Sequence, residues 1–202
     1  MLDRHLRPLI DPPLDRMGRR LAAAGVGADA VTLAGLAAGL AAAAAIVAGV
    51  FWVALGLIVL SRLADGLDGA VARALGPSDF GGYLDITADY VFYGAIPLAF
   101  VLHDPAANGA AGAFLLVSFY VNGASFLGYA ILAERRGLRS RSHGVKSLYF
   151  TAGLLEGTET IAFFVLLCLL AQHFAPLAWA FGTLCFITAL ARVLMARRVF
   201  GG

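Results

Sequence analysis

Four aspartates stand in a very apolar part of the chain, at spacings that group them into two pairs. Asp65 and Asp68 are three residues apart, and Asp85 and Asp89 are four apart, within "SRLADGLDGAVARALGPSDFGGYLDITADY" at 61–90. Residues at these spacings share one face of a helix. If two antiparallel helices meet at the turn at 76–80, a rise of about 1.5 Å per residue places Asp65 about 14 Å and Asp89 about 12 Å from the turn. We therefore expect the four carboxylates to converge at one depth.

A group of four acids in a medium of low dielectric constant needs cations if all four are to remain ionised. Carboxylate oxygens are hard ligands, which suit Mg2+, Mn2+ or Ca2+ better than zinc. Two metal ions that share such carboxylates would polarise a phosphoryl oxygen and neutralise a leaving phosphate. Arg73 follows the acids closely enough to meet a phosphate. Glycines flank the acids, where a bulky ligand would approach the backbone: Gly66, Gly69, Gly81 and Gly82.

The rest of the chain must supply the helices that position these acids. Of its 202 residues, 60% are hydrophobic and 14% are charged, and the mean hydropathy is +0.83. In a soluble domain, about half of the residues are apolar and about a quarter are charged. Six apolar runs are long enough to cross a bilayer: 29–49, 51–74, 81–101, 108–133, 146–171 and 174–196. The sequence predicts an all-α fold, a polytopic membrane helical bundle with six transmembrane helices.

The distribution of the 15 Lys and Arg residues predicts the orientation of the bundle. These residues gather before the first run, between Arg135 and Lys146, and at the end of the last run. The loops expected on the opposite side, near 50, at 103–109 and at 172–176, contain none. Because basic residues favour the cytoplasmic side, we expect an integral protein of a bacterial-type inner membrane with both termini and the opening of the active site in the cytoplasm.

The segment 1–25 has no apolar core of a signal peptide. Its apolar residues alternate with arginines at near-helical spacing, interrupted by Pro12 and Pro13. This pattern favours an amphipathic helix lying on the membrane surface, although the two prolines also allow a disordered basic tail. We expect one membrane domain over residues 1–202, made of this segment and a six-span core at 29–199.

The acids have two other interpretations. If they only paired with Arg62 and Arg73 to hold helices together, two of the four would lack a partner. A divalent-cation transporter should carry polar groups toward both faces of the membrane and often has internal repeats. Here the acids gather in the cytoplasmic half and centre, and no repeat is evident. No pattern of a nucleic-acid-binding protein is present either.

The spacing of these residues resembles the signature of the CDP-alcohol phosphotransferase family. Residues 65–89 read D-x-x-D-G-x-x-A-R, then seven residues, then G-x-x-x-D-x-x-x-D. The resemblance implies that the four aspartates hold two divalent metal ions, Mg2+ or Mn2+, and that Asp89 is also the general base. It implies a CDP pocket lined by Gly69, Ala72, Arg73 and Gly81. Family members often carry Pro-Asn ahead of a Thr near the nucleotide; this chain has Ala28-Asp29 before Thr32, so Thr32 is the weaker assignment.

The resemblance also implies a reaction of phospholipid synthesis. A phosphatidyl group would pass from a CDP-alcohol, with CDP-diacylglycerol as the expected donor, to a hydroxyl acceptor with release of CMP. A CDP-linked headgroup with diacylglycerol as acceptor is the alternative donor pair. The expected partners are these substrates, the lipid bilayer and a second copy in a homodimer, with no nucleic acid. A catalytically silent CDP- or lipid-binding relative is a further alternative, but every signature position is intact.

Two features bear on the acceptor and point in opposite directions. The basic residues Arg139, Arg141 and Lys146 would bind an acceptor phosphate, unless they reflect only membrane orientation and anionic lipids. Glu156 and Glu159, at the depth of the aspartates, would instead favour a cationic acceptor, unless Arg192 or hydroxyl groups hold them. Asn122 and Ser125 could line the same cavity or form hydrogen bonds between helices. The sequence leaves the acceptor open.

Overall fold

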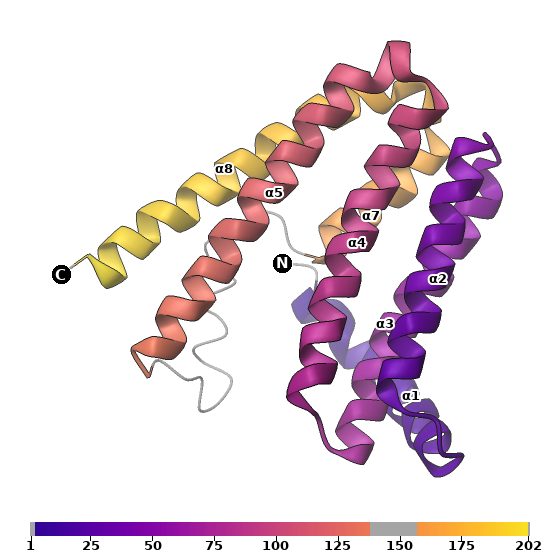
Figure 1. The fold of residues 1–202 in the computed structure, drawn as a ribbon, viewed down its shortest axis with the longest axis vertical. Coiled ribbons are helices and arrows are strands. Elements are labelled where there is room, and N and C mark those ends of the chain that lie inside the picture. Colours follow the sequence, from indigo (N-terminus) through magenta and orange to yellow (C-terminus); the bar gives the residue numbers. More distant parts are fainter. Residues whose placement is uncertain (1–2, 138–156, 202) are drawn as a thin grey trace.

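The computed structural model describes residues 3–137 and 157–201, and every regular element within these ranges is a helix. The elements are α1 (Asp3–Ala23), α2 (Ala28–Val47), α3 (Phe51–Leu75), α4 (Asp79–His103), α5 (Pro105–Arg135), α7 (Gly157–Leu169), the 3-10 turn η1 (Ala171–His173) and α8 (Phe174–Phe200). Figure 1 shows the helices after α1 running along the bundle, while α1 lies obliquely at its lower end. The predicted all-α class is confirmed.

Four segments of the bundle are long and apolar enough to cross a membrane: Ala28–Val47, Asp79–His103, Pro105–Arg135 and Ala171–Phe200. α3 is not among them because it carries Arg62, Asp65 and Asp68 along its length. The described part of α7 is apolar but has only 13 residues. An integral membrane protein is therefore supported, whereas the count of six spans remains a prediction.

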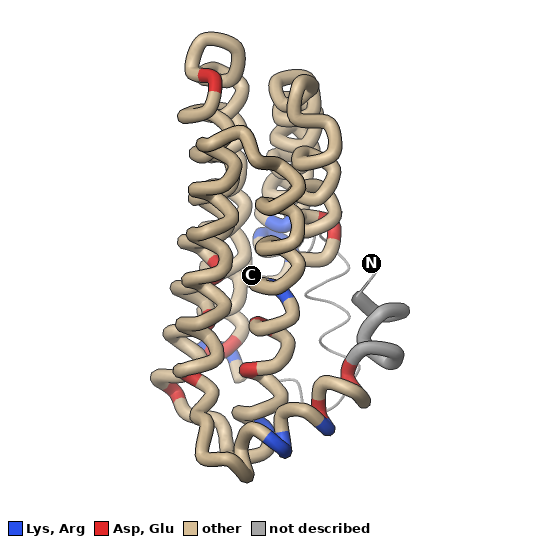
Figure 2. Tube along the Cα trace, turned by 90° about the vertical axis from the view of Figure 1, so that its right-hand side faces the viewer, with Lys and Arg blue, Asp and Glu red and all other residues tan. Residues whose placement is uncertain are grey.

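Charged residues are distributed unevenly along the bundle. In Figure 2, no Lys or Arg of the described chain lies at the upper end, where α2 meets α3 and α4 meets α5. Basic residues lie instead on α1 and toward the other ends of the helices. The asymmetry matches the sequence pattern, and the side of the membrane that it implies remains a prediction.

α1 is one continuous helix from Asp3 to Ala23, and the interruption expected at Pro12 and Pro13 is not seen. Both prolines lie on the exposed side of α1, where backbone groups without a helical partner can reach solvent. α1 packs against α3 at Gly18, where an added Cβ would lie 2.7 Å from the backbone carbon of Ala70. Its amphipathic role on the membrane surface remains a prediction.

Small residues let α2 approach α3 and α4 closely. A Cβ at Gly35 would lie 3.0 Å from the Ala64 Cβ on α3, and one at Gly39 would lie 2.6 Å from the Phe92 ring on α4. Because these glycines have no side chains, the three helices can pack at short distances. α2, α3 and α4 thus form the compact part of the bundle that carries the acids (Figure 1).

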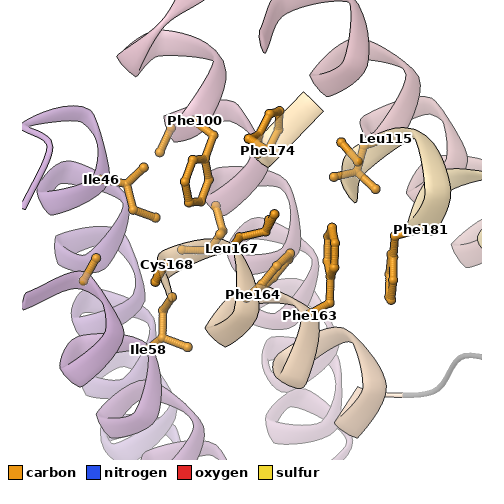
Figure 3. Packing of buried hydrophobic residues seen from close by; sticks show 14 of the residues in the cluster. Ile46, Ile58, Phe100, Leu115, Phe163, Phe164, Leu167, Cys168, Phe174 and Phe181 are labelled. Atoms are coloured by element: carbon orange, nitrogen blue, oxygen red, sulfur yellow. The ribbon is translucent and has the colours of Figure 1, made fainter. Parts of the chain in front are cut away.

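A hydrophobic core rich in aromatic rings joins α7 and α8 to the other helices (Figure 3). Phe163 of α7 stacks on Phe181 of α8 with 3.9 Å between ring centroids. Phe100 of α4 stacks on Phe174 at 4.9 Å. Such contacts set the helix positions through shape, since apolar burial itself gives little drive between helices in lipid.

Candidate active site

Three of the four predicted acids lie together between α3 and α4. Asp65, Asp85 and Asp89 each offer a carboxylate oxygen, and the three oxygens lie within 4.8 Å of one another. All three side chains are half-buried. We call these three residues the carboxylate cluster. Its geometry follows from the antiparallel pair of helices and from the helical spacing of the acids.

Asp68 stands apart from the carboxylate cluster and turns toward α2. Its side chain is buried, with 5% of its surface exposed, and its Oδ2 accepts a hydrogen bond of 2.6 Å from Oγ1 of Thr32. The expected convergence of four carboxylates is therefore seen for three of them. The sequence could place Asp68 on the right face of α3, but the bond that directs its carboxylate comes from a helix 36 residues away.

A half-buried arginine on α3 contacts two acids of the carboxylate cluster. Nη1 of Arg62 lies 2.7 Å from Oδ1 of Asp89 and 3.5 Å from Oδ1 of Asp65. Its guanidinium also lies 4.0 Å from the centre of the Phe92 ring. From the sequence, Arg62 was considered only as a partner that holds helices together. The available signal was its position three residues before Asp65, on the same helix face.

A cavity of about 310 Å³ opens beside the acids between the start of α2, the end of α3 and the start of α4. We call it the signature cavity. Its lining includes four of the five residues predicted to bind CDP, and two of the aspartates: Thr32, Gly69, Ala72, Gly81, Asp68 and Asp85. Small residues keep this space open. At Gly81, for example, an added Cβ would lie 2.9 Å from Oγ of Ser78 and 3.2 Å from Oδ1 of Asp29 and would crowd the cavity wall.

The fifth residue predicted to bind CDP, Arg73, is not among those lining the signature cavity. Its Nη2 lies 2.7 Å from Oδ1 of Asp15 on α1, and 58% of its side chain is exposed. The structure thus places Arg73 at the junction of α1 and α3, one turn beyond Gly69. The sequence could not indicate this partner because Asp15 lies 58 residues earlier in the chain.

A second cavity of about 470 Å³ lies on the other side of the carboxylate cluster, between α4, α5, α7 and α8. We call it the aromatic cavity, since its lining includes Tyr90, Tyr93, Phe119, Tyr120 and Phe126. Asp89 also lines it, whereas Asp85 lines the signature cavity. The carboxylate cluster therefore separates two cavities and presents one acid to each.

Arg192 is a buried arginine, which the sequence suggests only as a partner of Glu156 and Glu159. It lines the aromatic cavity, and Nη1 donates hydrogen bonds to Oδ1 of Asn122 at 2.9 Å and Oγ of Ser125 at 2.6 Å. Asn122 and Ser125 therefore do join two helices, α5 and α8. Asn122 also lines the aromatic cavity, so both interpretations of its role hold.

The residues predicted to bind the acceptor fall largely outside the described part of the chain. This applies to Arg139, Arg141, Lys146 and Glu156. Glu159 lies in the first turn of α7 and is half-buried. It is not among the residues that line the two cavities. Its role remains a prediction.

The donor set of the carboxylate cluster fits a divalent cation. Its three ligand groups are all carboxylates, the hard oxygen donors that Mg2+ and Mn2+ prefer. Three ionised acids so close together also repel one another, and Arg62 supplies one positive charge against three negative ones. One divalent cation would balance the two negative charges that remain.

The fold and the sequence have counterparts in known proteins. Over 91% of this chain, the fold superimposes with a TM-score of 0.72 and 22% sequence identity on 93% of the crystal structure of Mycobacterium tuberculosis phosphatidylinositol phosphate synthase (PgsA1) with CDP-DAG bound. Inner membrane protein YnjF of Escherichia coli strain K12 is 46% identical over 193 residues, which are 96% of this chain and 94% of YnjF. Archaetidylinositol phosphate synthase of Pyrococcus horikoshii is 36% identical over 91 residues, 42% of this chain and 45% of that protein.

Residues 26–195 match the CDP-alcohol phosphatidyltransferase family. The match begins just before α2 and ends within α8, so it includes the carboxylate cluster and the residues of both cavities. The chain, a phosphatidyl group transferase of phospholipid synthesis, therefore belongs to the CDP-alcohol phosphatidyltransferase family.

Proposed function

We propose that this enzyme transfers a phosphatidyl group from CDP-diacylglycerol to a hydroxyl acceptor and releases CMP. The observation that carries the proposal is the position of the carboxylate cluster between the two cavities. One cavity has the small residues of the family signature, and the other has the acid expected to be the base. Family membership makes the chain a CDP-alcohol phosphotransferase. The geometry supports a donor in the cavity lined by the small signature residues and an acceptor in the cavity lined by Asp89.

The signature cavity is the proposed site of the CDP moiety. Gly69, Ala72 and Gly81 line it without bulky side chains, so a nucleotide can lie against the backbone of α3 and α4. It also lies at the start of α4, which Ser78 caps through a hydrogen bond from the Gly81 amide. Backbone amides at a helix start favour phosphate groups. Arg73 holds Asp15 through Nη2, and its Nη1 would lie 3.4 Å from a Cβ at Gly69, which lines this cavity.

Two divalent cations, Mg2+ or Mn2+, would be held by Asp65, Asp68, Asp85 and Asp89. They would supply positive charge that neutralises the pyrophosphate and the departing CMP. Asp68 contributes from the side of the signature cavity, where it accepts a hydrogen bond from the Thr32 hydroxyl. The protein's own task is to hold these carboxylates in place against their mutual repulsion.

Asp89 is the proposed general base because it is the member of the carboxylate cluster that lines the aromatic cavity. An acceptor hydroxyl that enters this cavity would give its proton to Asp89. The acceptor oxygen would form the new bond to the β-phosphorus of the donor, the phosphorus that carries the lipid. The bond from that phosphorus to the bridging oxygen would break, and CMP would leave with the electron pair.

An anionic acceptor is the first to test, because Arg192 brings a guanidinium to the aromatic cavity. Two of the similar proteins are named as inositol phosphate lipid synthases. Whether Arg139, Arg141 and Lys146 or Glu156 and Glu159 also contact the acceptor remains part of this proposal. We further propose a homodimer with both termini and the donor entry on the cytoplasmic side, and α1 lying on that membrane surface.

The test is release of CMP by the purified protein in detergent, with CDP-diacylglycerol and Mg2+ or Mn2+. Glycerol 3-phosphate, inositol phosphate, inositol, serine, choline and ethanolamine are supplied singly. Metal-dependent release with one acceptor, lost in Asp89→Asn, is the expected result. If the protein binds neither CDP-diacylglycerol nor metal and carries divalent cations across vesicles, it is a transporter and the proposal fails. Binding of CDP-diacylglycerol without turnover of any donor pair would identify a silent relative.

A further inference from the structure

We propose that Arg62 is a positioning residue that serves as a fixed counter-ion of the carboxylate cluster. Its guanidinium holds Asp89 in place and keeps the three carboxylates together when no metal is bound. The inference rests on the proposed function, in which the carboxylate cluster holds metal. Arg62 lies outside the signature and acts on three of its acids.

Arg62 is held in one position by contacts on several sides. Nη1 bonds to Asp89 at 2.7 Å and lies 3.5 Å from Asp65, and Nη2 donates to Oγ of Ser61 at 3.2 Å. Ser61 in turn donates to the backbone oxygen of Gly35 on α2 at 2.8 Å. The Phe92 ring lies against the guanidinium plane at 4.0 Å. A planar fork held in this way can fix the orientation of a carboxylate, which a mobile ammonium would not do.

Arg62 reaches Asp89 from the side away from the substrates. It is not among the residues that line the signature cavity or the aromatic cavity, and only 11% of its side chain is exposed. It therefore acts through Asp89 and does not itself contact a substrate in either cavity. Its bond engages Oδ1 of Asp89, so Oδ2 is the oxygen that would accept the acceptor proton.

The charge of Arg62 matters most when metal is absent. Asp65, Asp85 and Asp89 lie within 4.8 Å at their closest oxygens, so without a cation they would repel one another strongly. One guanidinium removes part of that repulsion. The same positive charge must oppose a metal ion that binds the same acids. Arg62 therefore stabilises the metal-free protein and weakens metal binding, whereas a residue that only joins α3 to α4 would do the first without the second.

The test compares Arg62→Gln, Arg62→Lys and the wild type, with Arg198→Gln at the exposed end of α8 as a matched loss of charge. Thermal unfolding in detergent is measured in EDTA and in saturating Mn2+, and Mn2+ affinity is measured by electron paramagnetic resonance without substrates. We expect Arg62→Gln to unfold several degrees lower in EDTA and to recover most of this loss in Mn2+. Its Mn2+ dissociation constant should fall roughly tenfold, since one nearby positive charge is gone.

At saturating Mn2+, kcat for CMP release should fall in Arg62→Gln while the KM for CDP-diacylglycerol stays near that of the wild type, because Asp89 is no longer held. Arg62→Lys keeps the charge without the fork, so its Mn2+ affinity should match the wild type while its kcat is reduced. An equal loss of stability with and without Mn2+, at unchanged affinity, would overturn the proposal and leave Arg62 as a simple link between helices. If Arg62→Gln does not fold, tighter Mn2+ binding by Arg62→Lys than by the wild type overturns it.

These measurements separate the inference from the proposed function. Mn2+ affinity and unfolding do not depend on the choice of donor or acceptor. A wild type that binds Mn2+ as expected but turns over no CDP-alcohol would refute the proposed reaction and leave the counter-ion role standing. If Mn2+ neither changes the unfolding temperature of the wild type nor shows binding by electron paramagnetic resonance, both the metal site and the role of Arg62 toward it are refuted.

Discussion

The hydroxyl of Thr32 donates a 2.6 Å hydrogen bond to Oδ2 of Asp68, and this bond joins the start of α2 to the signature stretch of α3. Both side chains are buried, with 7% of Thr32 and 5% of Asp68 exposed. Both also line the signature cavity. The bond explains why Asp68 turns away from the carboxylate cluster, and it gives Thr32 a structural task that the family spacing alone supported weakly.

Thr32→Val should lower activity because it leaves a buried carboxylate without its hydroxyl donor, at a cost of about 1–3 kcal/mol. We expect a loss of roughly tenfold or more in kcat/KM for the CDP-alcohol donor and a lower temperature of unfolding. Thr32→Ser keeps the hydroxyl and serves as the control. Steady-state CMP release and thermal unfolding measure both effects. Equal behaviour of the two variants would show that the bond does not orient Asp68.

Asp89→Asn should abolish turnover and leave donor binding largely intact. An amide cannot accept the acceptor proton, while Asp65, Asp68 and Asp85 still offer carboxylates to the metal ions that would neutralise the donor pyrophosphate. A fall of at least about 10²-fold in kcat is expected, which is typical of a lost general base. CMP release and equilibrium binding of CDP-diacylglycerol measure the two properties.

The control for this substitution is Asp79→Asn, an exposed acid in the first turn of the same helix that lines neither cavity. It should keep wild-type turnover. Turnover by Asp89→Asn at a rate near that of the wild type would remove Asp89 from the role of base.

The helices and the site acids could largely be predicted from the sequence because both depend on local pattern. The run predicted at 51–74 is α3 at Phe51–Leu75, and that predicted at 81–101 lies within α4 at Asp79–His103. Glycines mark the ends: Gly49 and Gly76 have φ of 76° and 98°, which other residues rarely adopt. With the helix axes fixed, the spacing of Asp65, Asp85 and Asp89 determines the face on which they meet.

The partners that orient these residues could not be predicted, because each comes from a distant part of the chain. Thr32 holds Asp68, Asp15 holds Arg73, and Arg62 reaches across to Asp89 on the next helix. Helical spacing indicates which face a side chain occupies, but the bond that it makes depends on how helices pack. The same holds for Arg192, whose partners Asn122 and Ser125 lie on α5, about 70 residues earlier.

Gly81→Ala should weaken donor binding by narrowing the signature cavity. The new Cβ would lie 2.9 Å from Oγ of Ser78 and 3.2 Å from Oδ1 of Asp29, so neighbouring groups must shift. Overpacking of this kind costs about 1–3 kcal/mol, and we expect the KM for CDP-diacylglycerol to rise roughly tenfold with a smaller change in kcat. Gly56→Ala, whose Cβ would meet nothing within 4 Å, is the matched control. An unchanged KM in Gly81→Ala would place the nucleotide elsewhere.

Arg73→Gln and Asp15→Asn should have different effects although the two residues form one ion pair. The pair is largely exposed and contributes about 0–1 kcal/mol, so Asp15→Asn should leave the temperature of unfolding nearly unchanged. It should also leave the KM for CDP-diacylglycerol unchanged or lower it, since the charge of Arg73 is no longer shared with a carboxylate. Arg73→Gln should raise this KM by roughly tenfold or more, because a charge-assisted contact to phosphate is lost. CMP release at varied donor concentration measures both variants. If they raise KM equally, the pair acts through the position of α1, and Arg73 does not bind the donor.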